Sequence, residues 1–116
     1  MSSVYDTAMI LINVKFPVRP EKVDEWTSLA VGYAEAVEAE EGCLFFEWSS
    51  SLADPSVFVA VEGFRDAAAG AAHVGTPHFA ELIAKGPDLV AAQPQIIYID
   101  APEVEGWGPM GEIQPR

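Results

Sequence analysis

The chain has 116 residues, enough for one domain with a hydrophobic core, and its 50% hydrophobic content excludes a disordered protein. Its 18 acidic and 6 basic residues give a formal net charge of −12. With so few basic residues we expect neither nucleic acid nor a membrane surface as a partner, and uncharged aromatic substrates suit this balance better.

No apolar run reaches the ~20 residues of a membrane-spanning helix. The first residues, MSSVYDTAM, lack the basic and then apolar layout of a signal peptide, so we expect a cytoplasmic protein. The single cysteine, Cys43, excludes an internal disulfide and a cysteine-cluster metal site, and we expect it to be a buried, inert thiol.

Alternation predicts a first strand over residues 10–16. One face of this strand would carry Ile10, Ile12, Val14 and Phe16, and the other Leu11, Asn13 and Lys15. Residues 20–40 then predict a helix that begins at Pro20. Its apolar positions recur at helical spacing, namely Val23, Trp26, Ala30, Tyr33, Ala34 and Val37. Gly42 suits a left-handed position just past the helix end.

Two further strands, 44–50 and 57–64, meet at a turn over residues 52–56. In the second strand we expect Leu44, Phe46 and Trp48 on one face and Cys43 and Phe45 on the other. The third strand is apolar on both faces apart from Glu62.

A short helix over 67–74 is predicted to be capped by Asp66 and ended by Gly75. The next helix opens with Thr76 and Pro77, and the run Lys85-Gly86-Pro87 is typical of a helix end. Residues 92–100 predict the last strand, with Pro94 near its start or on a sheet edge.

With the second helical part split in two at Gly75, the order β-α-β-β-α-β predicts an α+β, ferredoxin-like fold with an antiparallel sheet over residues 8–100. Residues 1–7 form a short preceding segment. The tail 101–116 contains Trp107 and Met110, so we expect it to pack on the protein. Because two helices cover only one face of such a sheet, something else must cover the second apolar face.

Four pieces of this sequence are similar to the antibiotic biosynthesis monooxygenase (ABM) family: residues 41–44, residues 61–66, His73, and residues 76–79. Together with Asn13 in the first strand, the resemblance covers roughly residues 8–100. It implies a dimeric α/β barrel, in which the sheet of a second copy covers the open face. We therefore expect a homodimer.

The same resemblance indicates two catalytic candidates, Asn13 and His73. In the haem-degrading branch of the family a strand-1 asparagine contacts the reacting group, and many ABM sequences carry a histidine at the position of His73. An imidazole can accept a phenolic proton near neutral pH. The alternatives are an amide bound by neighbouring backbone and a histidine that interacts with its helix dipole.

A wider set of side chains is expected to bind the substrate. It comprises Trp26, Tyr33, Phe46, Trp48, Glu62, His78, Phe79 and Ile83. For several of these a structural role is the alternative: the aromatic residues as core, Glu62 as a partner of Arg65, and His78 as part of a helix start. The acidic run 38–41 is expected to be solvated surface.

No cofactor is expected. The two histidines lack the HExxH spacing of a zinc site, and no glycine-rich phosphate loop for a nucleotide or flavin is present. The haem-degrading branch has its axial histidine where this chain has Ile83, so haem degradation is not expected.

These features predict a cofactor-independent monooxygenase that acts on a phenolic, quinol or polyketide-type aromatic and dioxygen, with His73 as base and Asn13 as donor. Two alternatives stay open. One is an isomerase or lyase for a small carbonyl compound on the same scaffold, and the other is a non-catalytic small-molecule binding protein.

Overall fold

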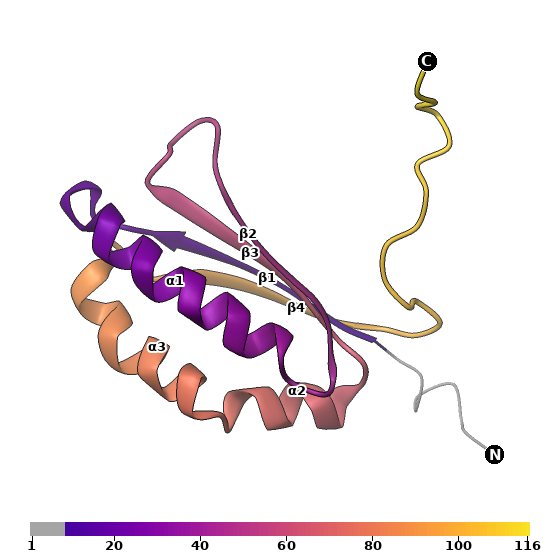
Figure 1. Ribbon diagram of the computed structural model, residues 1–116, viewed down its shortest axis with the longest axis horizontal. Helices are drawn as coiled ribbons and strands as arrows, with labels where there is room; N and C mark the ends of the chain where they lie inside the picture. The colour runs from indigo at the N-terminus through magenta and orange to yellow at the C-terminus, as the bar shows by residue number, and fades with distance from the viewer. Residues whose placement is uncertain (1–8) are drawn as a thin grey trace.

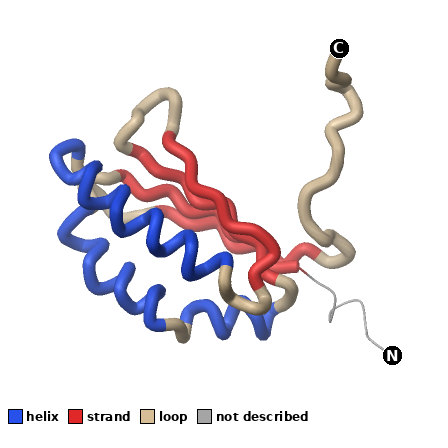
Figure 2. Tube along the Cα trace, in the orientation of Figure 1, coloured by secondary structure: helices blue, strands red, loops and turns tan. Residues whose placement is uncertain are grey.

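The computed structural model describes residues 9–116, so the expected segment 1–7 lies outside the described residues. Within them, four strands form one antiparallel sheet, and the helices pack against one of its faces (Figures 1 and 2). The strands are β1 (Met9–Pro17), β2 (Cys43–Ser50), β3 (Val57–Phe64) and β4 (Gln95–Ala101). The helices are α1 (Val23–Glu38), α2 (Ala67–Val74) and α3 (Pro77–Leu89), and a 3-10 turn, η2 (Pro20–Lys22), precedes α1.

The sheet order β2-β3-β1-β4 and the element order β-α-β-β-α-β confirm the ferredoxin-like α+β fold. The predicted caps form as well. The Asp66 carboxylate accepts a hydrogen bond from the backbone N–H of Ala69 at 2.8 Å, and the Thr76 hydroxyl accepts one from the N–H of Phe79 at 3.3 Å. The two helices therefore begin where the sequence predicts.

The core lies between the helices and the inner face of the sheet. Strand alternation places Ile10 and Ile12 on this face, and their partners on β3 are Phe64 and Glu62. From α1 the buried residues are Trp26, Ala30, Tyr33 and Val37, all members of the predicted apolar stripe. The alternation in the sequence thus identifies the inner face correctly.

The prediction for the start of β2 is wrong by one residue. Cys43 pairs with Phe64 and Phe45 with Gly63, so Leu44 is the extra residue of a β-bulge. The bulge turns Cys43 to the inner face, where it packs against the core. Cys43 is half-buried, and burial is the main cause that raises the pKa of its thiol to about 11.

Gly42 is not in a left-handed conformation, contrary to the prediction, since the positive φ angles within residues 9–116 belong to Glu103 and Gly106. Its role is packing: a Cβ at Gly42 would collide with the side chain of Ala69 on α2. The loop after α1 therefore lies directly against α2.

The end predicted for α3 is also wrong, because the helix continues through Gly86 and Pro87 to Leu89. Leu89 is buried in the core, and the Val90 N–H donates to the Gly86 carbonyl. A proline in the last helical turn removes one N–H donor. Burial of the Leu89 side chain favours this continuation of the helix.

No helix among residues 9–116 covers the outer face of the sheet (Figure 1), and Ile97 on β4 is 59% exposed there. Beyond β4, residues 102–116 leave the sheet and project away from the helices (Figure 1). The Trp107 ring lies 5.4 Å from that of Phe45, centroid to centroid, yet Trp107 is 73% exposed. The tail thus contacts its own protomer here while most of Trp107 stays in solvent.

No helix within residues 9–116 is both long and apolar enough to cross a membrane.

We propose that the sheet of a second copy covers the outer face and buries well over ~1,200 Å² in total. Light scattering of the wild type should then give a mass twice that of the 12.5 kDa chain. Ile97→Glu should shift the protein toward the monomer, because a charge would be buried between the sheets. Val31→Glu, at an exposed apolar position on α1, is the matched control. A monomeric wild type at micromolar concentration would contradict the proposal.

Candidate active site

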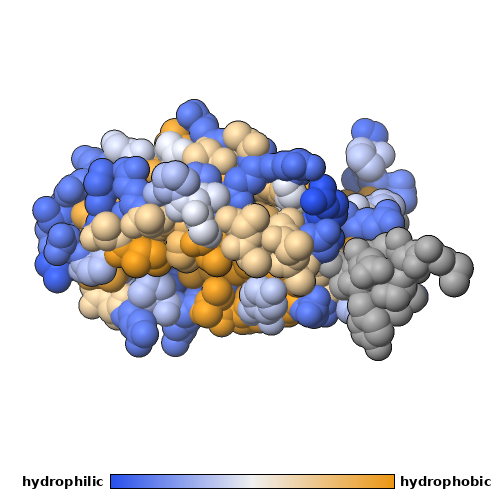
Figure 3. Space-filling view, turned by 90° about the horizontal axis from the view of Figure 1, so that it is seen from below, coloured by the Kyte–Doolittle hydropathy of each residue, from blue (hydrophilic) through white to orange (hydrophobic). Residues whose placement is uncertain are grey.

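A cavity of about 650 Å³ lies between the helices and the inner face of the sheet. Its floor includes Ile12 on β1, Glu62 on β3 and Tyr98 on β4, while α2 and α3 contribute His73 and Phe79. Two of its lining residues, Ile83 and Ile96, are also exposed to solvent. Figure 3 shows a band of apolar surface on the side where α2 and α3 lie in Figure 1. The cavity is thus apolar, open to solvent and large enough for a small molecule.

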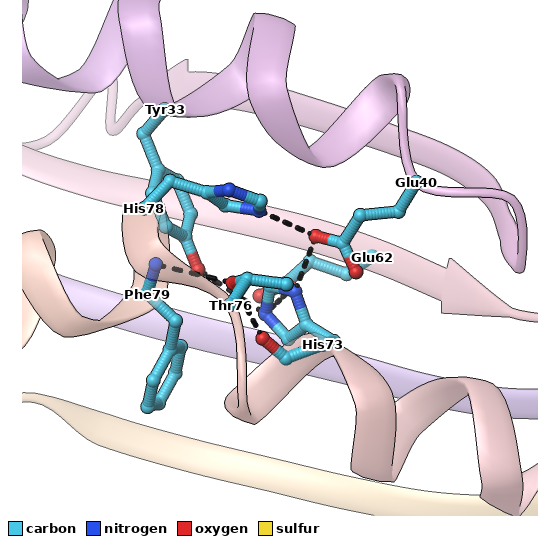
Figure 4. A network of polar contacts seen from close by, with 7 residues as sticks. All are labelled: Tyr33, Glu40, Glu62, His73, Thr76, His78 and Phe79. Carbon is cyan, nitrogen blue, oxygen red and sulfur yellow. Dashed lines mark hydrogen bonds and ion pairs between the residues drawn. The ribbon is translucent and has the colours of Figure 1, made fainter.

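His73 is the central polar group of this cavity. It lies in the last turn of α2 and is only 3% exposed. Its Nδ1 is 2.8 Å from Glu40 Oε2, and its Nε2 is 3.2 Å from the Tyr33 hydroxyl (Figure 4). An ionised carboxylate only accepts hydrogen bonds, so a neutral His73 carries its proton on Nδ1 and donates it to Glu40. Nε2 is then an acceptor that faces the cavity, and the Tyr33 hydroxyl donates to it.

Glu40 is the site residue that the sequence interpretation missed, since it was assigned to a solvated acidic run. Its side chain is 12% exposed, and its Oε2 also lies 2.7 Å from His78 Nε2. Glu40 follows Tyr33 and Val37 at spacings of seven and three residues, which continues the buried face of α1 past the helix end. That spacing is the signal by which the sequence could have revealed it.

Glu62 is buried on the inner face of β3 and lies in the cavity wall. Its Oε1 is 3.5 Å from His73 Nε2 and makes no hydrogen bond. Burial raises the pKa of the Glu62 carboxyl to about 7, and the nearby Glu40 adds to the shift. The structural alternative for Glu62, a pairing with Arg65, is not formed, because Arg65 contacts Glu41 and Asp66.

Tyr33 is held in its protonated form by the same surroundings. Burial, followed by the charges of Glu62 and Glu40, raises the pKa of its phenol well above the ordinary value. Tyr33 therefore serves as a neutral hydrogen-bond donor.

Six of the ten predicted site residues line the cavity: Tyr33, Trp48, Glu62, His73, Phe79 and Ile83. The other four do not. Asn13 lies between Ile12 and Val14 and so points to the outer face of the sheet, away from His73. Trp26 and Phe46 are core residues that pack edge-to-face against Trp48, and His78 bonds to Glu40. The expected pairing of Asn13 with His73 is therefore not formed within the protomer.

The structure also brings possible metal ligands together. One ligand atom each of Glu40, His73 and His78 lies within 4.8 Å of the others. The sequence interpretation expected no metal because it considered histidine spacing along the chain. Here the ligands come from three segments, the loop after α1, the end of α2 and the start of α3.

The raised pKa of Glu62 makes stability depend on pH. The ordinary glutamate pKa is 4.5 and the folded value about 7, so between these values the folded state binds more protons than the unfolded chain. The stabilising contribution of protonated Glu62 is present at low pH and is lost as pH rises through about 7. Glu62→Gln removes this pH dependence. The melting temperature of Glu62→Gln minus that of the wild type should therefore increase by a few degrees between about pH 5 and about pH 8.5. Calorimetry with a chelator present measures this.

Glu47→Gln is the control, because Glu47 is exposed on β2. Its melting temperature relative to wild type should stay constant over the same pH range. An equally flat difference for Glu62→Gln would show that Glu62 is ionised at both pH values.

Comparison with known proteins places the chain in a family. Residues 9–85 match the model of the antibiotic biosynthesis monooxygenase family. The "Putative monooxygenase YcnE" of Bacillus subtilis is 30% identical over 95 residues, which is 82% of this chain and 100% of that protein. An uncharacterised Synechocystis protein, sll1783, is 31% identical over 91 residues, 78% of this chain and 60% of its own length.

Solved structures agree with this result. A Caulobacter crescentus protein described under the same family name has a TM-score of 0.79 and 29% identity, and the match covers 86% of this chain and 95% of that one. A conserved Methanosarcina mazei protein has a TM-score of 0.77 at 24% identity, over 84% of this chain and 96% of the other, which supports the fold alone. The chain belongs to the antibiotic biosynthesis monooxygenase family.

Proposed function

We propose that this protein is a cofactor-independent monooxygenase that oxidises a phenolic, quinol or polyketide-type aromatic with dioxygen. One observation carries the proposal. His73 is fixed by Glu40 at Nδ1 and presents Nε2 to an apolar cavity, next to Tyr33 and Glu62. The name of the Bacillus subtilis relative supports the class of reaction.

The substrate class follows from the cavity. Its apolar lining and its volume of about 650 Å³ suit a small aromatic molecule. Glu40 and Glu62 lie beside His73, and the chain carries a net charge of −12, so an anionic substrate would be repelled. A neutral phenol that ionises only inside the site fits the apolar lining and avoids this repulsion.

Proton removal is the first step. The substrate hydroxyl takes the place of the Tyr33 hydroxyl at Nε2 and gives its proton to that nitrogen. Glu40 orients the imidazole as the carboxylate does in other carboxylate–histidine pairs. The imidazolium that forms lies between Glu40 at 2.8 Å and Glu62 at 3.5 Å, and an ionised carboxylate at either position stabilises it.

The electron-rich substrate anion then reduces dioxygen. A C–O bond forms at a ring carbon ortho or para to the ionised oxygen that carries one hydrogen, and the resulting peroxide loses this hydrogen as a proton while its O–O bond breaks. One oxygen atom remains as a carbonyl and the other leaves as water. The substrate ring supplies all four electrons that reduce dioxygen, so no external reductant enters. The neutral Tyr33 hydroxyl is placed to donate to the developing peroxide charge.

Oxygen consumption with a panel of phenols, hydroquinones and polycyclic phenols tests the reaction class. We expect turnover in the presence of a chelator and without added flavin or haem, with one atom of isotopically labelled dioxygen in the product. Formation of an isomer without oxygen uptake would identify the isomerase or lyase alternative. Binding without turnover across the panel would indicate a binding protein.

His73→Ala should lower turnover by roughly 10²–10⁴-fold, the usual contribution of a general base, while circular dichroism stays unchanged. His78→Ala should lower it much less, because His78 does not line the cavity. Turnover can be measured by oxygen uptake on one active substrate. A larger loss in His78→Ala than in His73→Ala would contradict the assignment of the base.

Asn13→Ala separates the two assignments of the donor. The resemblance to the family points to Asn13, whereas the cavity geometry points to Tyr33. We expect Tyr33→Phe to lower turnover by about 10²-fold or more, as for the loss of an oxyanion donor. We expect Asn13→Ala to stay close to wild type. The reverse result would reinstate Asn13.

A further inference from the structure

Glu40, His73 and His78 form a compact cluster of three potential ligands, which we call the His–Glu cluster (Figure 4). Both contacts converge on one oxygen: Glu40 Oε2 is 2.8 Å from His73 Nδ1 and 2.7 Å from His78 Nε2. The cluster is largely buried, since His73 is 3% exposed and the side chain of Glu40 is 12% exposed. Three helix ends or connections hold it in place.

We propose that the His–Glu cluster binds one zinc-like divalent metal ion through His73 Nδ1, His78 Nε2 and a carboxylate oxygen of Glu40. Two imidazoles and one carboxylate are a ligand set that zinc accepts, and three protein ligands leave one coordination position open. Zinc ligands lie about 2.0–2.2 Å from the metal, so the nitrogen and oxygen atoms need only move apart slightly to admit the ion.

Glu62 is the independent observation that supports this site. Its side chain is 7% exposed, and its Oε1 makes no hydrogen bond although it lies 3.5 Å from His73 Nε2. When a metal occupies Nδ1, the imidazole proton must move to Nε2. There it can be donated to Oε1 of Glu62, which gives this buried oxygen the partner it lacks. Carboxylates hydrogen-bonded to the far nitrogen of a metal-bound histidine are a general feature of such sites.

The charge around the cluster also favours a dication. Among residues 9–116, the ion pairs of lysine and arginine engage other acids, and neither Glu40 nor Glu62 has a lysine or arginine partner. The ion-pair partners of both carboxylates among these residues are histidines. A bound divalent ion would therefore bring positive charge to a region where the fold has placed two carboxylates.

Titration of tag-free, metal-free protein with Zn²⁺ in a calorimeter tests the site. We expect one ion per chain with micromolar or tighter affinity. His78→Ala should weaken binding by at least 100-fold, and Glu62→Gln by about 10–100-fold, the usual effect of an outer-shell partner. Glu41→Gln is the control. Like Glu62→Gln it removes one negative charge, and Glu41 is the neighbour of Glu40 in the chain, but its side chain is 93% exposed, so this variant should bind Zn²⁺ with wild-type affinity.

A measurement on the wild type does not depend on whether a variant folds. The chain contains two histidines, so imidazole ¹⁵N signals can be assigned to one or the other. Added Zn²⁺ should produce metal-bound Nδ1 and protonated Nε2 in His73, and metal-bound Nε2 in His78. Unchanged ¹⁵N signals at saturating Zn²⁺, or equal affinity in wild type and His78→Ala, would overturn the proposal.

The metal-bound form has a consequence for catalysis that depends on the proposed function. A proton on Nε2 prevents His73 from accepting one from the substrate, so Zn²⁺ should inhibit oxygen uptake and a chelator should restore it. The binding experiments contain no substrate. Metal binding without any oxygenase activity would therefore refute the proposed function alone, and activity without metal binding would refute this inference alone.

Discussion

The hydrogen bond between Glu40 and His73 is the interaction on which the rest of the site depends. A buried carboxylate is destabilising unless donors surround it. Glu40 receives one N–H from His73 and one from His78, so the loop after α1, the end of α2 and the start of α3 converge on one oxygen atom. The same bond sets the tautomer of His73, and the tautomer decides whether Nε2 can accept a proton from a molecule in the cavity.

Glu40 and Glu62 are chemically identical side chains that the fold places in different surroundings. Glu40 accepts two hydrogen bonds, whereas the Oε1 of Glu62 accepts none, and the pKa of Glu62 rises to about 7. Glu62 can therefore exist in either protonation state near neutral pH. Acid–base sites commonly use two like groups whose different environments hold them in different protonation states.

The sequence predicts most of the fold because its signals are local. Strand alternation, helical spacing, and the caps at Asp66 and Thr76 are all present in the structure. The errors arise where tertiary contacts decide. Gly42 is required by the close approach of Ala69, and burial of Leu89 carries α3 past Pro87.

The residues of the candidate site could likewise be predicted where the signal is local, and were missed where tertiary contacts decide. His73, Glu62 and the aromatic residues of the cavity could be selected from the sequence as polar or aromatic positions within apolar elements. Glu40 could not be separated from its acidic neighbours by composition, because its burial depends on two histidines more than 30 residues away. The side on which Asn13 lies follows directly from its alternation with Ile12 and Val14, and here the resemblance to the family pointed elsewhere.

β4 connects the two faces of the sheet. It is an edge strand that pairs with β1. Ile96 and Tyr98 line the cavity, while alternation turns Ile97 and Ile99 to the outer face. All four side chains are exposed in the protomer, so helices bury neither face of this strand. A second copy packed on the outer face would restrict the motion of β4 and with it one wall of the cavity. The proposed dimer would then contribute to the shape of the site.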